Sequence, residues 1–461
     1  MHSPVDASVT PALGQWVSAL SLADVPADVR THLKLCLLDA IGCGLYGAAQ
    51  PWGRIAADVS IGFSRGGGAS LFGRVESVSP SDAALANGTA IHGFEIDDAH
   101  VSSSLHPGAV TVPAALALAQ TYKASGAALL TSLAAGYEVG LRVGICAGVK
   151  HSTSGYHVTG TVGPFASAAA AASVLGLDAA QSANALGIGG TQAGGLYSAR
   201  LGAMTKRFHA GRAAQSGVIA ACLARQGFTG SADVIEAPFG GFLSTLNGQH
   251  EAHTIIEDLG DRWETLRVGL KAYAACASAH TTIDAVRALR QQGLRADNLD
   301  ALTIRVSQKT QLNIGWPYQP SEIITAQMNG QYAAAVTLLD GDAFIDQYRQ
   351  ERLADPNILA LVPRIHFVHD AEIDRAGAAK RHTVKVEAKL HDGSKLSTTV
   401  EQRRGSAEHP LGRAELEAKF RQLTPHSAAD EFIAVIDNLE MEKDLRRLTS
   451  LISGPDSGST R

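Results

Sequence analysis

The sequence predicts a mainly α protein with an α+β second domain, in which an all-helical large domain is interrupted by a smaller α+β lid domain. Ala- and Gly-rich stretches with apolar residues at helical spacing fill the first half of the chain. Residues 301–307 alternate between apolar and polar side chains, and residues 383–400 have the pattern of a β-hairpin. Helical spacing then returns. We expect a discontinuous helical domain of residues 1–265 and 405–461 and a lid domain of residues 266–404, which is near the usual domain size.

Helix ends in the large domain are marked by capping residues. Ser79-Pro80 supplies a cap and a proline at the first helical position for a helix that runs to His92. Gly176 and Gly227 each follow a long helical pattern and are expected to end it. The helices expected here are 25–48, 79–92, 107–125, 127–149, 158–175 and 209–226.

The second half of the chain mixes strands with helices. The sequence Asp392-Gly393 lies between two runs of alternating residues, as in a tight hairpin turn. Helices are expected at about 279–293 and 324–340. Two more, at 413–422 and 428–451, return to the first domain. Residues 454–461 are expected to form a disordered tail.

Composition excludes several classes of function. The chain has 461 residues, a formal charge of −5 and no Lys/Arg-rich block, so a nucleic-acid partner is not expected. The uncharged run at 158–177 is rich in Gly, Ala, Ser and Thr, which indicates a buried helix and no membrane span. Five cysteines without CxxC spacing, and no signal peptide, predict a cytoplasmic protein with reduced thiols.

The densest group of reactive side chains lies between residues 92 and 108. His106 precedes Pro107, and proline favours the first helical position, so His106 is expected at a helix N-cap. The free N–H groups there attract anions and disfavour a protonated imidazole. A neutral histidine beside an anion site suits proton transfer on a carboxylate substrate. The carboxylates of this segment are Glu95, Asp97 and Asp98.

Three further segments could complete such a site. One is His157 with Thr159, again before a helix. The next precedes the helix at 209, and the last lies at the junction of the two domains, where ligand clefts tend to form. Together they offer cations and N–H donors for carboxylates and groups for proton transfer. The residues of these last two segments are Lys206, Arg207, His209, Lys271, Tyr273 and His280.

The residues alone leave other interpretations open. His92, Glu95 and Asp98 fall near one helix face and could hold a metal, although no HExxH or comparable spacing is present. The acidic residues could be a solvated helix cap, and the basic ones surface charges. Nucleotide cofactors are not expected, because no GxGxxG follows a strand and no GxxxxGK[ST] occurs.

The ordered set of these motifs resembles the MmgE/PrpD family, and the resemblance covers nearly the whole chain. The matching segments are His92-Gly-Phe-Glu-Ile-Asp-Asp with His106-Pro-Gly, His157 before Thr-Gly-Thr, Met204-Thr-Lys206 with His209-Ala-Gly, Lys271-Ala-Tyr273 with His280, and 326–339 before Asp340-Gly341. The family includes 2-methylcitrate dehydratase, cis-aconitate decarboxylase and iminodisuccinate epimerase. The resemblance implies a helical large domain, an α+β lid, no cofactor, no catalytic metal, and a homodimer.

The resemblance also implies roles for individual residues. His106 and His157 would be acid/base groups, and Lys206 and Lys271 would bind carboxylates or transfer protons. An acidic residue of the 92–108 segment and Tyr318 would complete the site. Two departures stand out: Glu95 occupies a place where the family often has Asp, and Val158 follows His157 where it often has Pro. The segment also lacks the Trp-bearing version associated with dedicated methylcitrate dehydratases.

The function that the resemblance implies is a cofactor-independent lyase that acts on a di- or tricarboxylic acid. A base would remove the proton α to a carboxylate and an acid would complete the reaction. A dehydratase of the 2-methylcitrate type is expected first, with an epimerase or a decarboxylase as alternatives. A metal-dependent hydrolase and a non-catalytic carboxylate-binding protein are the alternatives of other classes.

Overall fold

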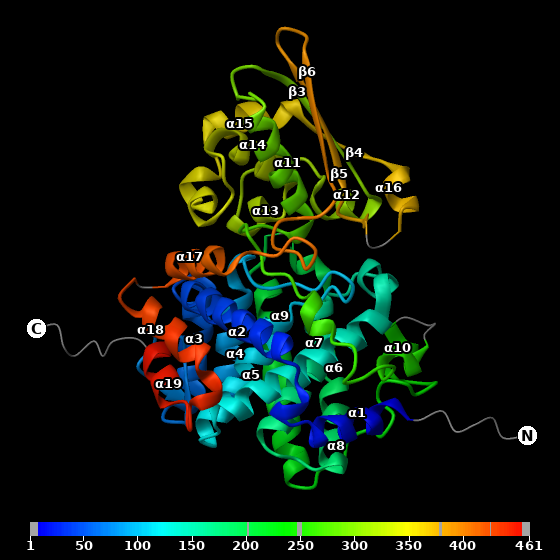
Figure 1. The fold of residues 1–461 in the computed structure, drawn as a ribbon, viewed down its shortest axis with the longest axis vertical. Coiled ribbons are helices and arrows are strands. Elements are labelled where there is room, and N and C mark those ends of the chain that lie inside the picture. The colour runs from blue at the N-terminus through cyan, green and yellow to red at the C-terminus, as the bar shows by residue number, and fades with distance from the viewer. Residues whose placement is uncertain (1–7, 201, 247–250, 378–379, 425, 454–461) are drawn as a thin grey trace, which may run out of the picture.

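The computed structural model describes residues 8–200, 202–246, 251–377, 380–424 and 426–453. A large helical body carries a smaller lobe that contains a four-stranded sheet (Figure 1). The mainly α prediction with an α+β second domain is therefore confirmed. The expected tail at 454–461 lies outside the described residues.

The helical body is built from ten helices and a two-stranded ladder in the described first half of the chain. Helices α4 to α9 pack on one another, and α1 contacts α8. The elements are α1 Val9–Ala19, α2 Ala27–Ala48, α3 Pro51–Ser64, β1 Ala69–Ser70, β2 Ser77–Val78, α4 Pro80–Ile91, α5 Pro107–Thr121, α6 Gly126–Thr153, α7 Val158–Val174, α8 Ala179–Gly190, α9 Thr205–Arg225 and α10 Phe242–Leu246.

Small residues let α9 lie close to its two neighbours. A Cβ atom on Gly211 would lie 2.1 Å from the backbone oxygen of Leu85 in α4, and one on Gly217 would lie 2.2 Å from Oγ of Ser167 in α7. Neither distance is possible for real atoms, so the helices can approach this closely only with glycine at these positions. The close packing fixes the start of α9, which carries Lys206, relative to α4 and α7.

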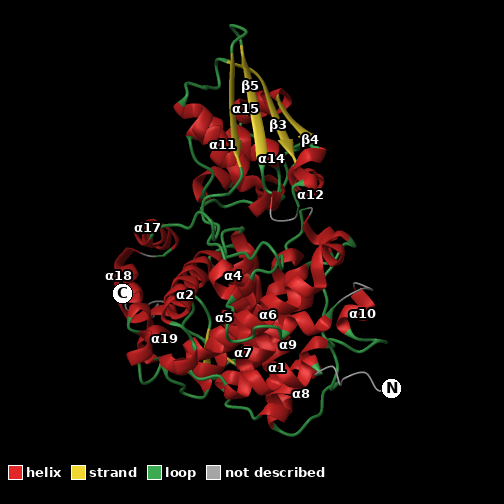
Figure 2. Ribbon diagram, turned by 45° about the vertical axis from the view of Figure 1, so that its right-hand side comes forward, coloured by secondary structure: helices red, strands yellow, loops and turns green. Residues whose placement is uncertain are grey.

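The α+β lobe is a mixed sheet covered on one face by helices α11 and α14 (Figure 2). The strand order is β4-β3-β5-β6, with β3 and β4 parallel and the other pairs antiparallel. The predicted hairpin is confirmed: β5 pairs with β6, and Gly393 has a φ of 85° in the turn. The elements are α11 His280–Gln291, β3 Leu299–Val306, α12 Gln308–Ile314, α13 Ile323–Gln327, α14 Gly330–Asp340, α15 Pro356–Leu361, β4 Ile365–His369, α16 Ala371–Arg375, β5 Val384–Leu390 and β6 Lys395–Val400.

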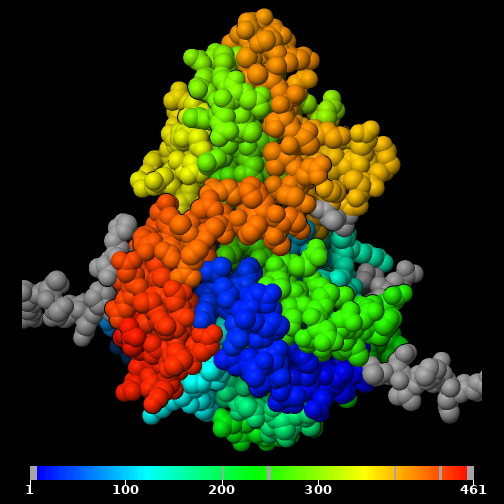
Figure 3. Space-filling view, viewed as in Figure 1, coloured from blue at the N-terminus to red at the C-terminus, as the bar shows by residue number. Residues whose placement is uncertain are grey.

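The chain returns to the helical body after β6. Figure 3 shows this segment, in orange, running from the lobe to the body. Helices α17 Arg413–Leu423 and α18 His426–Asp437 then pack on α2, and α19 Arg446–Ile452 packs on α18. Residues from both ends of the chain therefore share one core.

Several predicted elements differ in detail. The helix predicted at 324–340 is broken into α13 and α14, because Asn329 caps α14 by accepting a hydrogen bond from Tyr332 N. The helix predicted at 428–451 is also two helices, with a 3₁₀ turn at Leu439–Met441 between them. Helix α9 begins at Thr205, four residues earlier than predicted, so Lys206 lies in its first turn. Helices α1, α3 and α8 and strand β4 were not predicted.

One described helix, α6, is long and apolar enough to cross a membrane by length and composition alone. However, 89% of its most apolar window is buried inside the protein, and it packs on α5 and α7. We conclude that α6 is a core helix. The five cysteines are free, with Cys146 and Cys222 only partly buried.

Candidate active site

His106 occupies the N-cap of α5, as the His-Pro-Gly sequence predicts. Its Nδ1 lies 2.7 Å from the backbone oxygen of Asp98 and 3.2 Å from Oδ2 of Asp97. Because a carbonyl oxygen can only accept, Nδ1 must carry the proton. The side chain is 16% exposed and lines a cavity. Nε2 is therefore the atom of His106 that can meet a substrate.

Asp98 fixes the start of the same helix. Gly108 N donates to both of its carboxylate oxygens, at 3.0 and 3.1 Å, and Tyr137 donates to Oδ2 at 2.8 Å. A Cβ on Gly108 would lie 2.9 Å from Oδ2, so only glycine leaves room for this contact. The helix N-terminus was expected to attract an external anion; Asp98 occupies that place instead.

The two adjacent aspartates are held in different states. Burial and the neighbouring Asp97 raise the pKa of Asp98 to about 8. Burial also acts to raise the pKa of Asp97, but His106, His92 and Lys271 outweigh it and hold that pKa well below its usual range. Asp97 is therefore the charged partner of the two imidazoles, and Asp98 carries a proton at neutral pH.

The raised pKa of Asp98 makes a testable prediction about stability. The folded protein keeps a proton on Asp98 between pH 4 and 8 that the unfolded chain has lost, so this group lowers stability as the pH rises through that range. Asp98→Asn removes the effect and can still accept a hydrogen bond. We expect the stability of the variant relative to the unmodified protein to increase from pH 5 to 8 and then to level off. Unfolding midpoints measured across this range would contradict the assignment if the two proteins ran in parallel.

His92 connects Asp97 to Lys206. Its Nδ1 lies 2.6 Å from Asp97 Oδ2, and its Nε2 lies 3.4 Å from Lys206 Nζ. The carboxylate accepts and the ammonium donates, so His92 is neutral with its proton on Nδ1. Burial, opposed in part by Asp97, lowers the pKa of His92 to about 4, which agrees with this tautomer.

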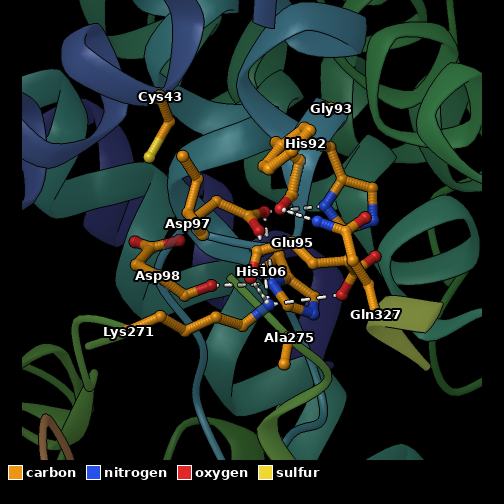
Figure 4. Close-up of polar contacts among 12 residues, drawn as sticks. Cys43, His92, Gly93, Glu95, Asp97, Asp98, His106, Lys271, Ala275 and Gln327 are labelled. Atoms are coloured by element: carbon orange, nitrogen blue, oxygen red, sulfur yellow. Dashed lines mark hydrogen bonds and ion pairs between the residues drawn. The ribbon is translucent and has the colours of Figure 1, made fainter. Parts of the chain in front are cut away.

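Glu95 connects the two lysines. It pairs with Lys206 through Oε1, and Lys271 Nζ lies 3.3 Å from Oε2 and 3.0 Å from the Glu95 backbone oxygen. Glu95 has a left-handed backbone, with a φ of 58°, at the end of a 3₁₀ turn. Burial acts to raise its pKa, but Lys206 and Lys271 hold it well below the usual range. Figure 4 shows Glu95, Asp97, His92 and Lys271 gathered around His106.

His157 occupies the N-cap of α7, on the opposite side of the same cluster. Its ring stacks at 5.4 Å from the His92 ring, and its Nδ1 lies 3.0 Å from Nδ1 of His209. Burial and then Lys206 lower the pKa of His157 well below its usual value. His157 is therefore a neutral imidazole at physiological pH, and it could accept a proton.

These side chains lie at one end of a cavity of about 400 Å³ between the helical body and the lobe. Glu95, His106, His157 and Lys206 reach the cavity from the body. Asp97, Lys271 and His209 lie behind them and contact them directly. From the lobe and its connecting segments come Cys276, Lys309, Asn313, Arg381, His382 and Arg403.

Besides Asp97, Asp98, Lys271 and His209, which lie behind the lining residues, five further predicted site residues do not line this cavity. Arg207 donates to Gly93 O and stacks on Trp52, at 3.8 Å from the ring centroid. The Tyr273 hydroxyl donates to Asp284, and the Tyr318 hydroxyl donates to the Leu353 backbone oxygen. The remaining two, His280 and Thr159, are fully buried. In each case the predicted polar group faces the protein interior, so these five are supporting residues in this structure.

Two groups of cavity or cluster residues were not among the predicted site residues. His92 belongs to a family segment and is a possible metal ligand, but it was given no catalytic or binding role, although its place beside Glu95 and Asp97 in the sequence was a usable signal. Lys309, Arg381 and Arg403 were missed entirely. Lys309 lies in the first turn of α12, and Arg381 and Arg403 lie in loops. They are 38 to 132 residues beyond Lys271, and no motif marks them.

One possible metal cluster occurs among the described residues. His92, Asp97 and His106 place one ligand atom each within 4.8 Å of one another. In the structure, however, Nδ1 of both histidines points at the same oxygen of Asp97, at 2.6 and 3.2 Å. These are hydrogen-bond and ion-pair contacts within the triad. A metal would have to replace these contacts.

Comparison with known proteins identifies the fold. The MmgE/PrpD N-terminal domain matches residues 11–254 and the MmgE/PrpD C-terminal domain matches residues 273–441. The chain belongs to the MmgE/PrpD family. Among curated relatives, the cis-aconitate decarboxylase-like protein oryM of Aspergillus oryzae is 31% identical, over 98% of both chains. Cis-aconitate decarboxylases of Aspergillus terreus and Homo sapiens are 29% and 27% identical, covering 98% and 97% of this chain and 97% and 95% of their own. These relatives support a lyase of this family.

Proposed function

We propose that this protein is a cofactor-independent lyase that decarboxylates an unsaturated tricarboxylate of the cis-aconitate type. The observation that carries the proposal is the placement of His106, whose Nδ1 is held by Asp98 and whose Nε2 is left for the cavity beside Lys206. The full-length likeness to cis-aconitate decarboxylases favours this reaction over the dehydration expected first from the sequence.

Decarboxylation of such a substrate requires one acid and no base. The bond between the methylene carbon and its carboxylate breaks, and its electron pair forms a new double bond. The electrons of the original double bond then take a proton at the alkene carbon farther from the methylene group, which keeps its own carboxylate. His106 Nε2 supplies this proton, and CO₂ leaves. The Asp97 carboxylate, 3.2 Å from Nδ1, balances positive charge on the ring.

Lys206 has the position to stabilise negative charge that develops during this step. It is 3% exposed, lies in the first turn of α9 and lines the cavity. A cation in a site from which water is largely excluded acts more strongly on an anion than it would in water. Glu95, which also pairs with Lys271, holds this ammonium in place from behind.

Dehydration is the second candidate, because the same cavity also contains a base. The neutral imidazole of His157 could remove a proton α to a carboxylate while His106 protonates a departing hydroxyl. Epimerisation would use the same pair, with the proton returned to the opposite face. These reactions differ from decarboxylation in needing a substrate with an acidic C–H bond.

One experiment separates these reactions. We expect incubation with cis-aconitate in D₂O to release CO₂ and to give a product with one deuterium at the protonated carbon, as read by NMR. If the protein removes water from 2-methylcitrate and releases no CO₂, the proposal is replaced by dehydration. If a chiral amino- or hydroxy-dicarboxylate exchanges a proton for deuterium without net conversion, the proposal is replaced by epimerisation. Activity that disappears after chelation and returns with a metal would favour the His92–Asp97–His106 cluster as a metal site.

A further inference from the structure

Arg403 is a buried cation for which the described residues supply no partner. It is 2% exposed, and none of its three guanidinium nitrogens has a hydrogen-bond partner among them. Leaving a charged group in this state is costly, so native proteins almost always pair it. Arg403 also lines the cavity, which it reaches from the segment after β6. The missing partner must therefore be something that enters the cavity.

The two carboxylates whose charges act on Arg403, those of Glu408 and Asp284, do not fill this role. Asp284 accepts hydrogen bonds from Tyr273 Oη at 2.6 Å and from Arg404 N at 2.9 Å. Glu408 is exposed. Neither carboxylate lies within 4.0 Å of Arg403, since no ion pair of Arg403 occurs in the described part of the chain.

Two further cations line the same part of the cavity. Arg381 donates to the Val101 backbone oxygen at 2.7 Å, and Lys309 donates to Ser152 Oγ at 2.7 Å. Both contacts are with neutral groups of the helical body, and neither cation forms an ion pair with a described carboxylate. His382, whose Nδ1 also has no hydrogen-bond partner in the described part of the chain, lies beside Arg381.

The charges of the site divide into two parts. Glu95 and Asp97 balance Lys206 and Lys271 at the end of the cavity that contains His106. No carboxylate of the described ranges compensates the three cations from the lobe in this way, so the cavity as a whole attracts a polyanion. Arginine binds carboxylates in a planar, two-point geometry, which favours a carboxylate group at Arg403.

We propose that Arg403, Arg381 and Lys309 form a carboxylate-binding subsite on the lobe side of the cavity. This lobe subsite holds the substrate carboxylate that is remote from the reacting carbon. The inference rests on the proposed function only for the identity of the substrate, since any anion would have to satisfy the same buried guanidinium. It assigns the selectivity for a tricarboxylate to residues of the lobe and the acid–base chemistry to residues of the body.

Calorimetric titration with tricarballylate tests the subsite without turnover, because this saturated tricarboxylate has no double bond to accept the electrons of a departing carboxylate. We expect Arg403→Met to raise the Kd by about 10- to 100-fold, the loss of a hydrogen-bonded charge pair. Lys309→Met should raise it less, because this residue is only partly buried. Arg305→Met is the matched control, since Arg305 is exposed on β3 of the same lobe. This variant should bind tricarballylate with an unchanged Kd.

Thermal unfolding distinguishes a binding role from a structural one. Removing an unpaired buried charge should leave the ligand-free Arg403→Met protein at least as stable as the unmodified protein. A lower Tm would show that Arg403 supports the fold, and would count against the proposal. If Arg403→Met does not fold, the Lys309→Met variant still tests the subsite. Unchanged binding of tricarballylate by Lys309→Met would also overturn the three-cation subsite.

The subsite and the proposed function can fail separately. Arg403-dependent binding of tricarballylate without CO₂ release from cis-aconitate would keep the subsite and reject the decarboxylase. If the Arg403→Met variant releases CO₂ from cis-aconitate with the KM of the unmodified protein and binds tricarballylate with the same Kd, the decarboxylase would be kept and the subsite rejected. Arg403-dependent binding of inorganic phosphate with no binding of tricarballylate would overturn the carboxylate assignment.

Discussion

His106→Asn is expected to lower kcat by about 100- to 10,000-fold, the contribution of a positioned general acid. The asparagine amide can still donate to the Asp98 backbone oxygen, as His106 Nδ1 does at 2.7 Å. The variant therefore keeps the contact with Asp98 and removes the nitrogen that faces the cavity. KM should change little, because the cations that bind the carboxylates remain in place.

The matched control is His366→Asn, which makes the same substitution at an exposed position of β4. It should leave kcat and KM unchanged. Steady-state kinetics of both variants, together with tricarballylate binding to His106→Asn, separate loss of the acid from loss of the site. A His106→Asn enzyme with more than a tenth of the original kcat would show that the proton comes from another group, and His157 would be the next candidate.

How far the sequence predicts this site depends on whether the contact is local. The N-cap position of His106 was predictable, because proline at the first helical position is a property of three consecutive residues. The hairpin of β5 and β6 was predictable for the same reason, from Asp392-Gly393 between alternating residues. What satisfies the N–H groups of α5 was not, because Asp98 lies on a loop whose path depends on tertiary packing.

Contacts between distant segments could be predicted only by resemblance or not at all. Lys271 meets Glu95 across 176 residues, and the family pattern placed both in one site. Arg403 carries no such pattern, and its importance follows only from its burial and its lack of partners. Resemblance also placed Tyr318 in the site. In the structure its hydroxyl donates to the Leu353 backbone oxygen, so its role in the site stays a prediction. A side chain's direction depends on the packing of its own lobe, which a motif does not encode.

Glu95→Gln is expected to lower the free energy of unfolding by about 3–5 kcal/mol, the cost of removing one partner from a buried ion pair. Glu95, Lys206 and Lys271 are 2%, 3% and 0% exposed, so water cannot compensate the lysines. After the substitution the one carboxylate near Lys271 among the described residues is Asp97, at 3.6 Å, beside the backbone oxygen of residue 95 at 3.0 Å, and Lys206 keeps the neutral His92. Urea unfolding measures the loss, and Glu387→Gln is the control. Glu387 pairs with Lys395 on the exposed surface of the hairpin, where such pairs contribute about 1 kcal/mol or less.

The pH dependence of this loss tests its electrostatic origin. In the unmodified protein burial acts to lower the pKa of Lys271, but Glu95 and Asp97 raise it above its usual value. Without Glu95 the effect of burial is less opposed, so the folded variant binds fewer protons than its unfolded chain as the pH rises toward the usual lysine pKa. Its stability should then increase with pH relative to the unmodified protein. We therefore expect the stability difference between Glu95→Gln and the unmodified protein to shrink between pH 7 and 9.5. A difference that stays constant over this range would indicate that the glutamate acts through packing and hydrogen bonding, and that the two lysines do not depend on its charge.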